Sequence, residues 1–359
     1  MNLRIPGPTP LPPEVLESMC REVIGHRGSA FEQLLAGVTT QLQHFFQTES
    51  QVLVLTSSGT GGLEAAVVNA MSPGDKVLAV TCGEFGERFA AIARAFGGDV
   101  EQLEFAWGRA LDAEQVGKAL ERRPDTRLLL TTHNETSTGV LNDLGAVADL
   151  LGSMGEGRPL WLVDAISSLG AVDLPMDGWR CDMVVSASQK AWMAPPGLSL
   201  VGVSQRAWEH AERAACPRFY WDLVAARDYA RRRQTPYTPA VSTLFALNAS
   251  LLRMREEGLA AIVARHKLLA QRLRKGVRQL GLGLLASNAD ASPTVTAVRL
   301  PEGMPASEVK RRLSAEHGIA VASGKGALKD RVLRIAHMGY CGSADIDAVL
   351  TALEKVLSP

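Results

Sequence analysis

The regular alternation of short apolar runs with helical segments between residues 52 and 203 constrains the fold most strongly. The runs are continuously apolar, which is typical of strands that are buried on both faces of a sheet. This alternation predicts an α/β fold with a mostly parallel sheet between two layers of helices. Ligands of such folds bind at the carboxyl ends of the strands, so we expect the chemistry in the loops that follow them. The predicted strands are Val52–Leu55, Lys76–Thr81, Arg127–Thr132, Leu160–Asp164, Asp182–Ser186 and Leu198–Val203.

The length of 359 residues and the 46% hydrophobic content predict two domains of unequal size. Five prolines between positions 6 and 13 forbid a helix there, so residues 1–14 are interpreted as an extended arm that must lie on another part of the chain. We expect a large domain over residues 15–256 and a smaller α/β domain over residues 257–359. The elements expected in the smaller domain are Ala260–Gln279 and Ala344–Leu357 as helices, and Thr294–Leu300 and Ile319–Ala322 as strands.

Charge and cysteine content narrow the class of partner. Lys and Arg total 38 and so do Asp and Glu, which leaves no bulk positive field to hold nucleic acid or an anionic membrane. No apolar run approaches the length of a membrane span, and the proline-broken N-terminus lacks the apolar core of a signal peptide. The five cysteines are scattered without a CxxC pair, so we expect no metal site and no disulfide framework. These observations predict a cytoplasmic protein whose partners are small molecules.

The loop after the first strand, TSSGTGG at Thr56–Gly62, has the character of a phosphate cradle. Its glycines allow close approach of the backbone, its hydroxyls donate hydrogen bonds, and the following helix presents free amides. The loop fits neither the Walker pattern nor GxGxxG. The alternative is a plain helix cap with no ligand.

The later loops add an aromatic ring, a group of hydroxyls and a carboxylate. Phe85 lies in CGEFGERF, where it either belongs to the core or stacks on a planar heterocycle. The loop His133–Gly139 is dense in short hydroxyl and amide groups. Asp164 ends an apolar strand, so it is either buried with a cationic partner or exposed on a turn.

Lys190 follows the strand Asp182–Ser186, in the segment DMVVSASQKAWMAPPG. A lysine at the mouth of a buried strand loses solvation and tends to become neutral, and a neutral amine can form an imine. The alternative is an ordinary solvated surface lysine. Only pyridoxal phosphate accounts for all these loops together, since it needs a phosphate cradle, a stacking aromatic, hydroxyl donors, a carboxylate at its ring nitrogen and a lysine.

Several motifs resemble a known family. The segments SSGTGGLEA, GEFGER, ETSTG, VDAISSLG and SASQKAWMAPPG resemble the class V aminotransferases of the pyridoxal phosphate fold type I, and within them the alanine-glyoxylate and serine-pyruvate or serine-glyoxylate group. The resemblance runs from PGPTPLP to RIAHMGY. The sulfur-transfer branch of this class usually has a histidine before the lysine, where this chain has Gln189. Fold type I implies a large domain with a seven-stranded type of sheet.

The resemblance assigns cofactor contacts to the first two loops and to the residues after Asp164. It implies that Ser58, Gly59 and Thr60 hold the phosphate. It further implies that Phe85 stacks on one face of the cofactor ring and that Ile166 packs on the other.

The resemblance also assigns the polar contacts of the ring. Thr136 and Gln189 are expected near the phenolic oxygen, and Asp164 at the ring nitrogen. Lys190 is expected to form the Schiff base. Asp164 and Lys190 are therefore the predicted catalytic residues.

Other positions are implied to bind substrate or to complete a neighbouring site. Arg334 is expected to grip the substrate α-carboxylate with Ser168 and the backbone of Gly7. Thr238, or Thr235 as second candidate, is expected to reach the cofactor phosphate of a second subunit. The resemblance thus implies a homodimer with shared sites.

The function predicted from these residues is transfer of an amino group between alanine or serine and glyoxylate or pyruvate by a ping-pong mechanism. Small monocarboxylates are favoured over glutamate or aspartate because one carboxylate-binding arginine is well placed, although Arg27 or Arg88 could supply a second anion site. One alternative is a pyridoxal phosphate lyase or cysteine desulfurase, for which only Cys341 lies near a suitable region. Another is a non-catalytic subunit of a larger complex, since some proteins of this group carry a hydrogenase-subunit label.

Overall fold

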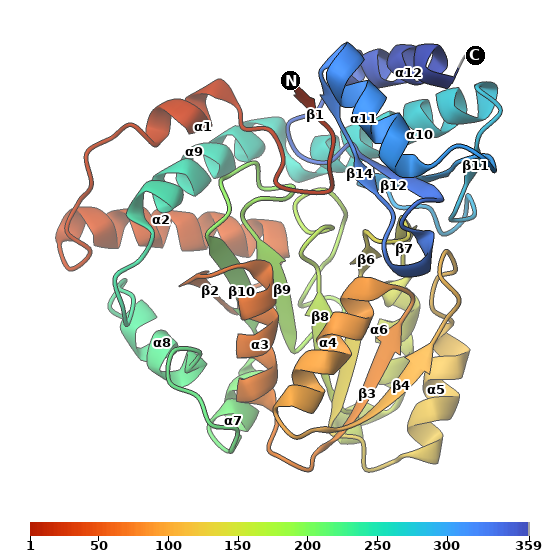
Figure 1. The fold of residues 1–359 in the computed structure, drawn as a ribbon. Helices are drawn as coiled ribbons and strands as arrows, with labels where there is room; N and C mark the ends of the chain where they lie inside the picture. The colour runs from red at the N-terminus through yellow and green to blue at the C-terminus, as the bar shows by residue number, and fades with distance from the viewer. Residues whose placement is uncertain (358–359) are drawn as a thin grey trace.

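A computed structural model describes residues 1–357 of the chain, and its centre is a seven-stranded sheet (Figure 1). All neighbouring strands are parallel except β10, which runs antiparallel to both β2 and β9. The predicted α/β fold with a mostly parallel sheet is confirmed. In spatial order the strands are β2 (Gln51–Thr56), β10 (Leu198–Val203), β9 (Met183–Ala187), β8 (Leu160–Asp164), β5 (Leu128–Thr132), β3 (Lys76–Thr81) and β4 (Asp99–Glu104).

The edge strand β4 is absent from the strands predicted from the sequence. Its sequence, DVEQLE, has few apolar residues, and none of its side chains is fully buried. An edge strand pairs on one side only, so it does not need the continuous apolar run that marks the interior strands. All six predicted strands form within a residue or two of their expected bounds.

Helices cover both faces of the central sheet, and successive strand residues point alternately into two apolar layers. Leu129 faces the layer made with α2, α5, α6 and α9, whereas Leu128 and Leu130 face the layer made with α3, α4, α7 and α8. Burial on both faces is why the strands are continuously apolar. The helices are α1 (Pro13–Ser18), α2 (Ser29–Phe46), α3 (Gly59–Ala70), α4 (Glu84–Ala95), α5 (Ala113–Arg122), α6 (Leu144–Ser153), α7 (Gln205–Ala211), α8 (Leu223–Ala230) and α9 (Val241–Glu257).

The C-terminal part has its own antiparallel sheet and its own apolar core. The expected strand Ile319–Ala322 is interrupted at Val321, which separates β13 from β14. The predicted domain boundary after residue 256 lies beside Gly258, the single residue between α9 and α10. The elements here are α10 (Leu259–Gln279), β11 (Gly283–Leu284), β12 (Val295–Arg299), α11 (Ala306–His317), β13 (Ile319–Ala320), β14 (Ala322–Ser323), β15 (Val332–Ala336) and α12 (Ser343–Leu357).

The N-terminal arm ties the C-terminal sheet region to the rest of the chain (Figure 1). Its strand β1 (Asn2–Leu3) pairs in parallel with β13, and the Arg4 carbonyl accepts a hydrogen bond from the amide of Ala336 at 2.8 Å. The arm then crosses the carboxyl ends of the central strands before α1 begins at Pro13. None of the helices within residues 1–357 is long and apolar enough to cross a membrane. Four short elements complete this part of the chain. They are β6 (Asn134–Glu135), β7 (Val140–Leu141), and the 3₁₀ turns Gly155–Gly157 and Gly326–Leu328.

Helix α3 lies very close to the sheet because position 62 is glycine. A Cβ atom there would lie 2.7 Å from Ser199 Cβ on β10 and 2.9 Å from Val185 Cγ1 on β9. Both neighbours belong to interior strands, so neither has room to move. The close approach brings the N-terminus of α3 to the carboxyl ends of β8 and β9.

We expect Gly62→Ala to lower the free energy of unfolding by about 1–3 kcal/mol, because the added methyl group overpacks the interface between α3 and the sheet. Gly152→Ala is the matched control, since position 152 is also helical and has no atom within 4 Å of an added Cβ. That variant should be neutral or more stable by up to about 1 kcal/mol. Urea unfolding measures both, and equal midpoints for the two variants would show that the close packing at position 62 is unimportant.

Candidate active site

A cavity of about 570 Å³ lies between the arm, the N-terminus of α4 and the C-terminal sheet. It opens at the carboxyl ends of the central strands, where a ligand of an α/β fold is expected. Its walls therefore come from segments that are far apart in the chain. The predicted site residues that line it are Gly7, Phe85, Thr136, Lys190 and Arg334.

The amine of Lys190 lies against the N-terminal arm. Its Nζ donates a hydrogen bond to the carbonyl oxygen of Pro6 at 2.5 Å, and the Lys190 carbonyl accepts one from Thr9 Oγ1 at 2.9 Å. A Cβ atom at position 7 would lie 2.7 Å from Nζ, and the φ of +135° at this position also favours glycine. Burial lowers the pKa of Lys190 to about 8, and the nearby carboxylate of Asp164 opposes that shift only in part. About a tenth of this amine is therefore neutral at pH 7, a far larger share than for an ordinary lysine with a pKa of about 10.4.

Asp164 ends β8, beside the strand that leads to Lys190, and only 4% of its surface is exposed. Its Oδ1 accepts a hydrogen bond from the amide of Ile166 at 2.9 Å. No lysine or arginine within residues 1–357 forms an ion pair with it. Burial raises the pKa of Asp164 to about 7, and the charge of Glu135 adds to the effect. This carboxyl group therefore needs a cationic or N–H partner to be stable as an anion.

The N-terminus of α3 lies next to Asp164 through Ile166. A Cβ atom at Gly59 would lie 2.7 Å from Ile166 Cδ1, so this helix end contacts the side chain that follows Asp164. Ser58 caps the helix by accepting a hydrogen bond from the amide of Gly61. The first amides of a helix have no partner within it and carry a partial positive charge, so this end can hold an anionic group.

Phe85 is held by a buried carboxylate that the sequence reasoning did not single out. Glu135 Oε2 accepts hydrogen bonds from the amides of Phe85 and Gly86 at 3.0 and 3.1 Å. Its Oε1 accepts two more from the amide and hydroxyl of Ser137. Burial raises the pKa of Glu135, and these hydrogen bonds oppose that rise. Glu135 thus joins the start of α4 to the loop that carries Thr136.

Arg334 lies on β15 with only 6% of its surface exposed. Its Nε donates to the carbonyl of Ser323 at 2.8 Å and its Nη1 to the carbonyl of Thr136 at 3.2 Å. No carboxylate of the described chain forms an ion pair with this guanidinium group. A buried cation that is bound only by carbonyl groups is suited to receive an anion from a ligand.

Among the buried polar atoms of residues 1–357 without a hydrogen-bond partner, three belong to segments that carry or adjoin these residues: Ser168 Oγ, Gln189 Oε1 and Thr132 Oγ1. Buried polar atoms without a partner are rare in folded proteins and commonly meet a ligand or an ordered water. Together with the unpaired Asp164, the free helix amides and the lowered pKa of Lys190, they give a site whose donors and acceptors fit pyridoxal phosphate.

Thr235 and Thr238 do not line this cavity. They lie with Tyr237 in a second groove, where the Thr235 hydroxyl donates to the Tyr237 carbonyl at 2.8 Å. Arg27 is bound to the same loop, because its guanidinium donates to the carbonyls of Thr235 and Pro236 at 2.6 and 3.0 Å. In this chain Arg27 therefore supports the loop that carries both threonines.

Arg88 is the other arginine considered as a second anion site, and it is also bound to neighbouring side chains. Its Nη2 lies 3.1 Å from Glu84 Oε1, and its Nη1 donates to Thr60 Oγ1 at 3.5 Å. Its guanidinium carbon lies 4.8 Å above the centre of the Phe85 ring. Arg88 thus links the two loops that were predicted to contact the cofactor.

Cys341 lacks the properties of a mobile nucleophile. Its thiol is buried, and burial raises its pKa to about 11. Nucleophilic cysteines are exposed and have lowered pKa values. The desulfurase alternative therefore has no support from this residue.

Comparison with known proteins shows consistent similarity over the whole chain. The model of the family "Aminotransferase class-V" matches residues 1–349. The "Soluble hydrogenase, small subunit" of Synechococcus sp. is 42% identical over 99% of this chain and 92% of its own length. The L-aspartate–glyoxylate aminotransferase of Paracoccus denitrificans is 37% identical over 99% and 90%. The crystal structure of the alanine–glyoxylate aminotransferase from Nostoc sp. superposes with a TM-score of 0.95 at 34% identity, covering 99% of this chain and 95% of that one.

The lowered pKa of Lys190 predicts unusual reactivity towards cyanate, which modifies only neutral amines. In protein freed of cofactor, labelling of Lys190 should rise with pH and reach half its maximum near pH 8, because its amine loses the proton there. Lys118 serves as the reference, since its hydrogen bond to Glu114 raises its pKa and its labelling should increase only at higher pH. Peptide mass spectrometry measures both. A midpoint above pH 10 for Lys190 would contradict the prediction.

Proposed function

This chain belongs to the class V aminotransferases and is a pyridoxal phosphate-dependent enzyme, and from that premise we propose that it transfers amino groups between alanine or serine and glyoxylate or pyruvate. The names of its relatives support this choice, since they include serine–glyoxylate and pyridoxamine–pyruvate aminotransferases. The observation that carries the proposal is that the amine of Lys190 and the guanidinium of Arg334 line one cavity, with Asp164 buried beside Lys190.

The residues that would hold the cofactor lie at the N-terminus of α3 and in the loops beside Asp164 and Lys190. Ser58, Gly59 and Thr60 would hold the phosphate at the N-terminus of α3. Phe85 and Ile166 would enclose the ring. When bound, pyridoxal phosphate supplies an aldehyde carbon and a ring that withdraws electrons from the substrate Cα.

Lys190 is proposed to move the proton of the substrate. Because its pKa is about 8, the neutral form of Lys190 is accessible, and its Nζ then has a lone pair. This lone pair can take the proton from Cα and return it. Asp164, with Oδ1 fixed by the amide of Ile166, would hold a proton on the cofactor ring nitrogen. The carbonyl of Pro6 orients Nζ from the side of the arm.

Arg334 is proposed to bind the substrate α-carboxylate. The carbonyls of Ser323 and Thr136 fix the plane of its guanidinium group, so little side-chain freedom remains to be lost when substrate binds. The unpartnered hydroxyl of Ser168 and the backbone of Gly7 would complete this contact. A small substrate held at both its amine and its carboxylate is positioned for proton transfer by Lys190.

We also propose a homodimer whose second groove faces the neighbouring site. The groove that contains Thr238 borders a cluster of aromatic side chains, with Phe219 80% exposed. Tyr220 and Tyr237 stack there with ring centres 5.0 Å apart. An exposed group of large aromatic residues is typical of a surface that binds another protein. A second copy of the chain bound there would cover these rings. Thr238 or Thr235 of the first copy would then lie near the cofactor site of the second copy.

The activity is tested by amino transfer from alanine to glyoxylate with the protein loaded with pyridoxal phosphate. We expect pyruvate and glycine as products, and Lys190→Ala should lower kcat by at least about 10²-fold, because the general base is lost. Lys118→Ala, a change at an exposed lysine, is the matched control and should keep full activity. Loaded wild-type protein that transfers no amino group from any small amino acid to glyoxylate or pyruvate would refute the proposal. Sulfide release from cysteine would instead support a desulfurase.

The dimer is tested by light scattering. The wild-type mass should be twice the chain mass of 38.4 kDa. Phe219→Glu should shift the equilibrium towards the monomer, because it places a charge in the aromatic cluster. Leu268 is a different exposed apolar residue, which lies on α10, and Leu268→Glu should leave the mass unchanged. A monomeric wild-type protein would contradict the prediction.

A further inference from the structure

The wall of the active-site cavity has an unusual excess of positive charge. Among the described residues that line it, five are cationic and none is a carboxylate. The chain as a whole has equal numbers of cationic and anionic residues, 38 of each. The cationic residues are Lys190, Lys310, Lys325, Lys329 and Arg334.

Two other charged hollows on the described surface contain at least as many carboxylates as cations. One is lined by Arg253 and Arg265 together with Glu256, Glu257 and Asp345. Another contains two arginines with Glu302 and Asp330. The excess at the active site is thus a property of this cavity, and it does not follow from composition.

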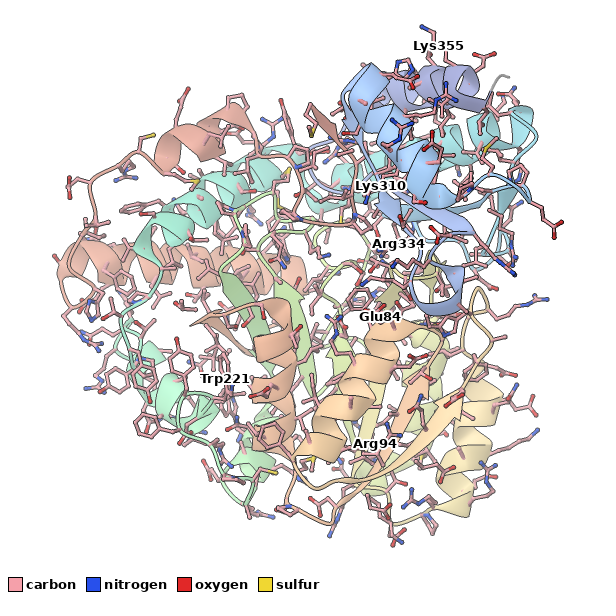
Figure 2. The ribbon with its side chains drawn as sticks, in the orientation of Figure 1. Glu84, Arg94, Trp221, Lys310, Arg334 and Lys355 are labelled. Carbon is pink, nitrogen blue, oxygen red and sulfur yellow. The ribbon has the colours of Figure 1, made fainter. Side chains whose placement is uncertain are left out.

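Of the five cations, Lys190 and Arg334 already have roles in the proposed function, which leaves three lysines. The cofactor phosphate does not account for them, because Ser58 and Thr60 lie outside the lining of this cavity. Lys310 projects from α11, whereas Lys325 and Lys329 lie on the segment between β14 and β15. Figure 2 shows Lys310, Arg334 and Glu84 in succession from the C-terminal sheet region to the start of α4.

One carboxylate near the cavity mouth serves two cations. Glu84 Oε1 lies 3.1 Å from Arg88 Nη2 and 3.3 Å from Lys325 Nζ. The Lys325 side chain is 42% exposed, so its ion pair is weak and exchanges readily. A lysine amine on a flexible stem can leave Glu84 for another anion without disturbing the backbone.

We propose that Lys325, with Lys310 and Lys329 around it, forms a second anion subsite that binds the side-chain carboxylate of an amino dicarboxylic acid such as aspartate or glutamate. The inference rests on the proposed function, since the same substrate would bind its α-carboxylate at Arg334. A substrate with two carboxylates is attracted by the field of the lysines and pairs its second carboxylate with Lys325, while a monocarboxylate leaves Lys325 on Glu84. One cavity thus serves a dicarboxylate in one half-reaction and a small monocarboxylate in the other.

This subsite replaces the two arginines considered from the sequence. Arg27 is bound to the loop of Thr235, and Arg88 is held between Glu84 and Thr60. Neither of them lines the cavity. Lys310, Lys325 and Lys329 are therefore the positive charges on this wall that a second carboxylate would meet.

The decisive variant is Lys325→Met in the holoenzyme, which keeps most of the stem and removes the charge. We expect kcat/KM for aspartate and for glutamate to fall about tenfold, as loss of a partly exposed charged contact implies, and that for alanine to change less than twofold. Lys355→Met is the matched control, because Lys355 lies on α12 away from the cavity (Figure 2). It should change neither value. Equal effects of Lys325→Met on aspartate, glutamate and alanine would overturn the subsite.

A binding measurement provides a readout that does not depend on turnover. Calorimetry of the holoenzyme should show succinate or maleate binding about tenfold more tightly than propionate, and Lys325→Met should remove that difference. Glu84→Gln frees Lys325 and should tighten dicarboxylate binding by severalfold. Equal affinities for succinate and propionate in the wild-type protein would overturn the proposal.

The two proposals fail in different ways. If alanine donates its amino group to glyoxylate but aspartate and glutamate neither react nor bind more tightly than monocarboxylates, the subsite is wrong and the aminotransferase function stands. If no amino acid donates, the proposed function itself is wrong. Succinate binding that depends on Lys325 would then still support the anion subsite.

Discussion

Burial of two ionisable side chains at the ends of neighbouring strands is the constraint on which the rest of the site depends. Lys190 follows β9 and Asp164 ends β8, and these strands are parallel neighbours. Removal from water disfavours the charged form of each group, so the pKa of Lys190 falls to about 8 and that of Asp164 rises to about 7. Neither group has an ion-pair partner in the described chain. The site is therefore built to be completed by a ligand that offers an electrophilic carbon to the amine and a basic ring nitrogen to the acid.

Three sets of contacts support the site around this pair. The arm contributes the Pro6 carbonyl to Lys190, and Gly7 allows the close approach. The four hydrogen bonds to Glu135 join the helix that carries Phe85 to the loop of Thr136. The Thr136 carbonyl in turn holds Arg334 of the C-terminal sheet. The contacts of Glu135 and of Arg334 share the loop of residues 135–137, so a change in one of them would affect the other.

Different groups bind the substrate and the cofactor in the proposed site. The cradle at α3 uses helix amides and hydroxyls, whereas the C-terminal part of the chain supplies lysines that reach the cavity from the outside. Glu84 keeps one of them, Lys325, near the entrance through a weak and exposed ion pair. An aminotransferase must bind two different substrates in the same place, and a movable cation lets one pocket accept different side chains without rebuilding its walls.

The sequence by itself determined the interior strands, the loops that follow them and the identity of the buried lysine and aspartate. Continuous apolar runs mark strands that are covered on both faces, and the residues directly after such strands must lie at one edge of a parallel sheet. The polar edge strand β4, the carboxylate of Glu135 under α4 and the lysines of the cavity wall have no comparable local signal. Only the tertiary structure decided that the arm lies on Lys190, that Arg27 supports the loop of Thr235, and that Lys325 meets Glu84. Those contacts join segments far apart in the chain, and they depend on how the C-terminal sheet and the arm pack across the strand ends, which no local pattern of residues specifies.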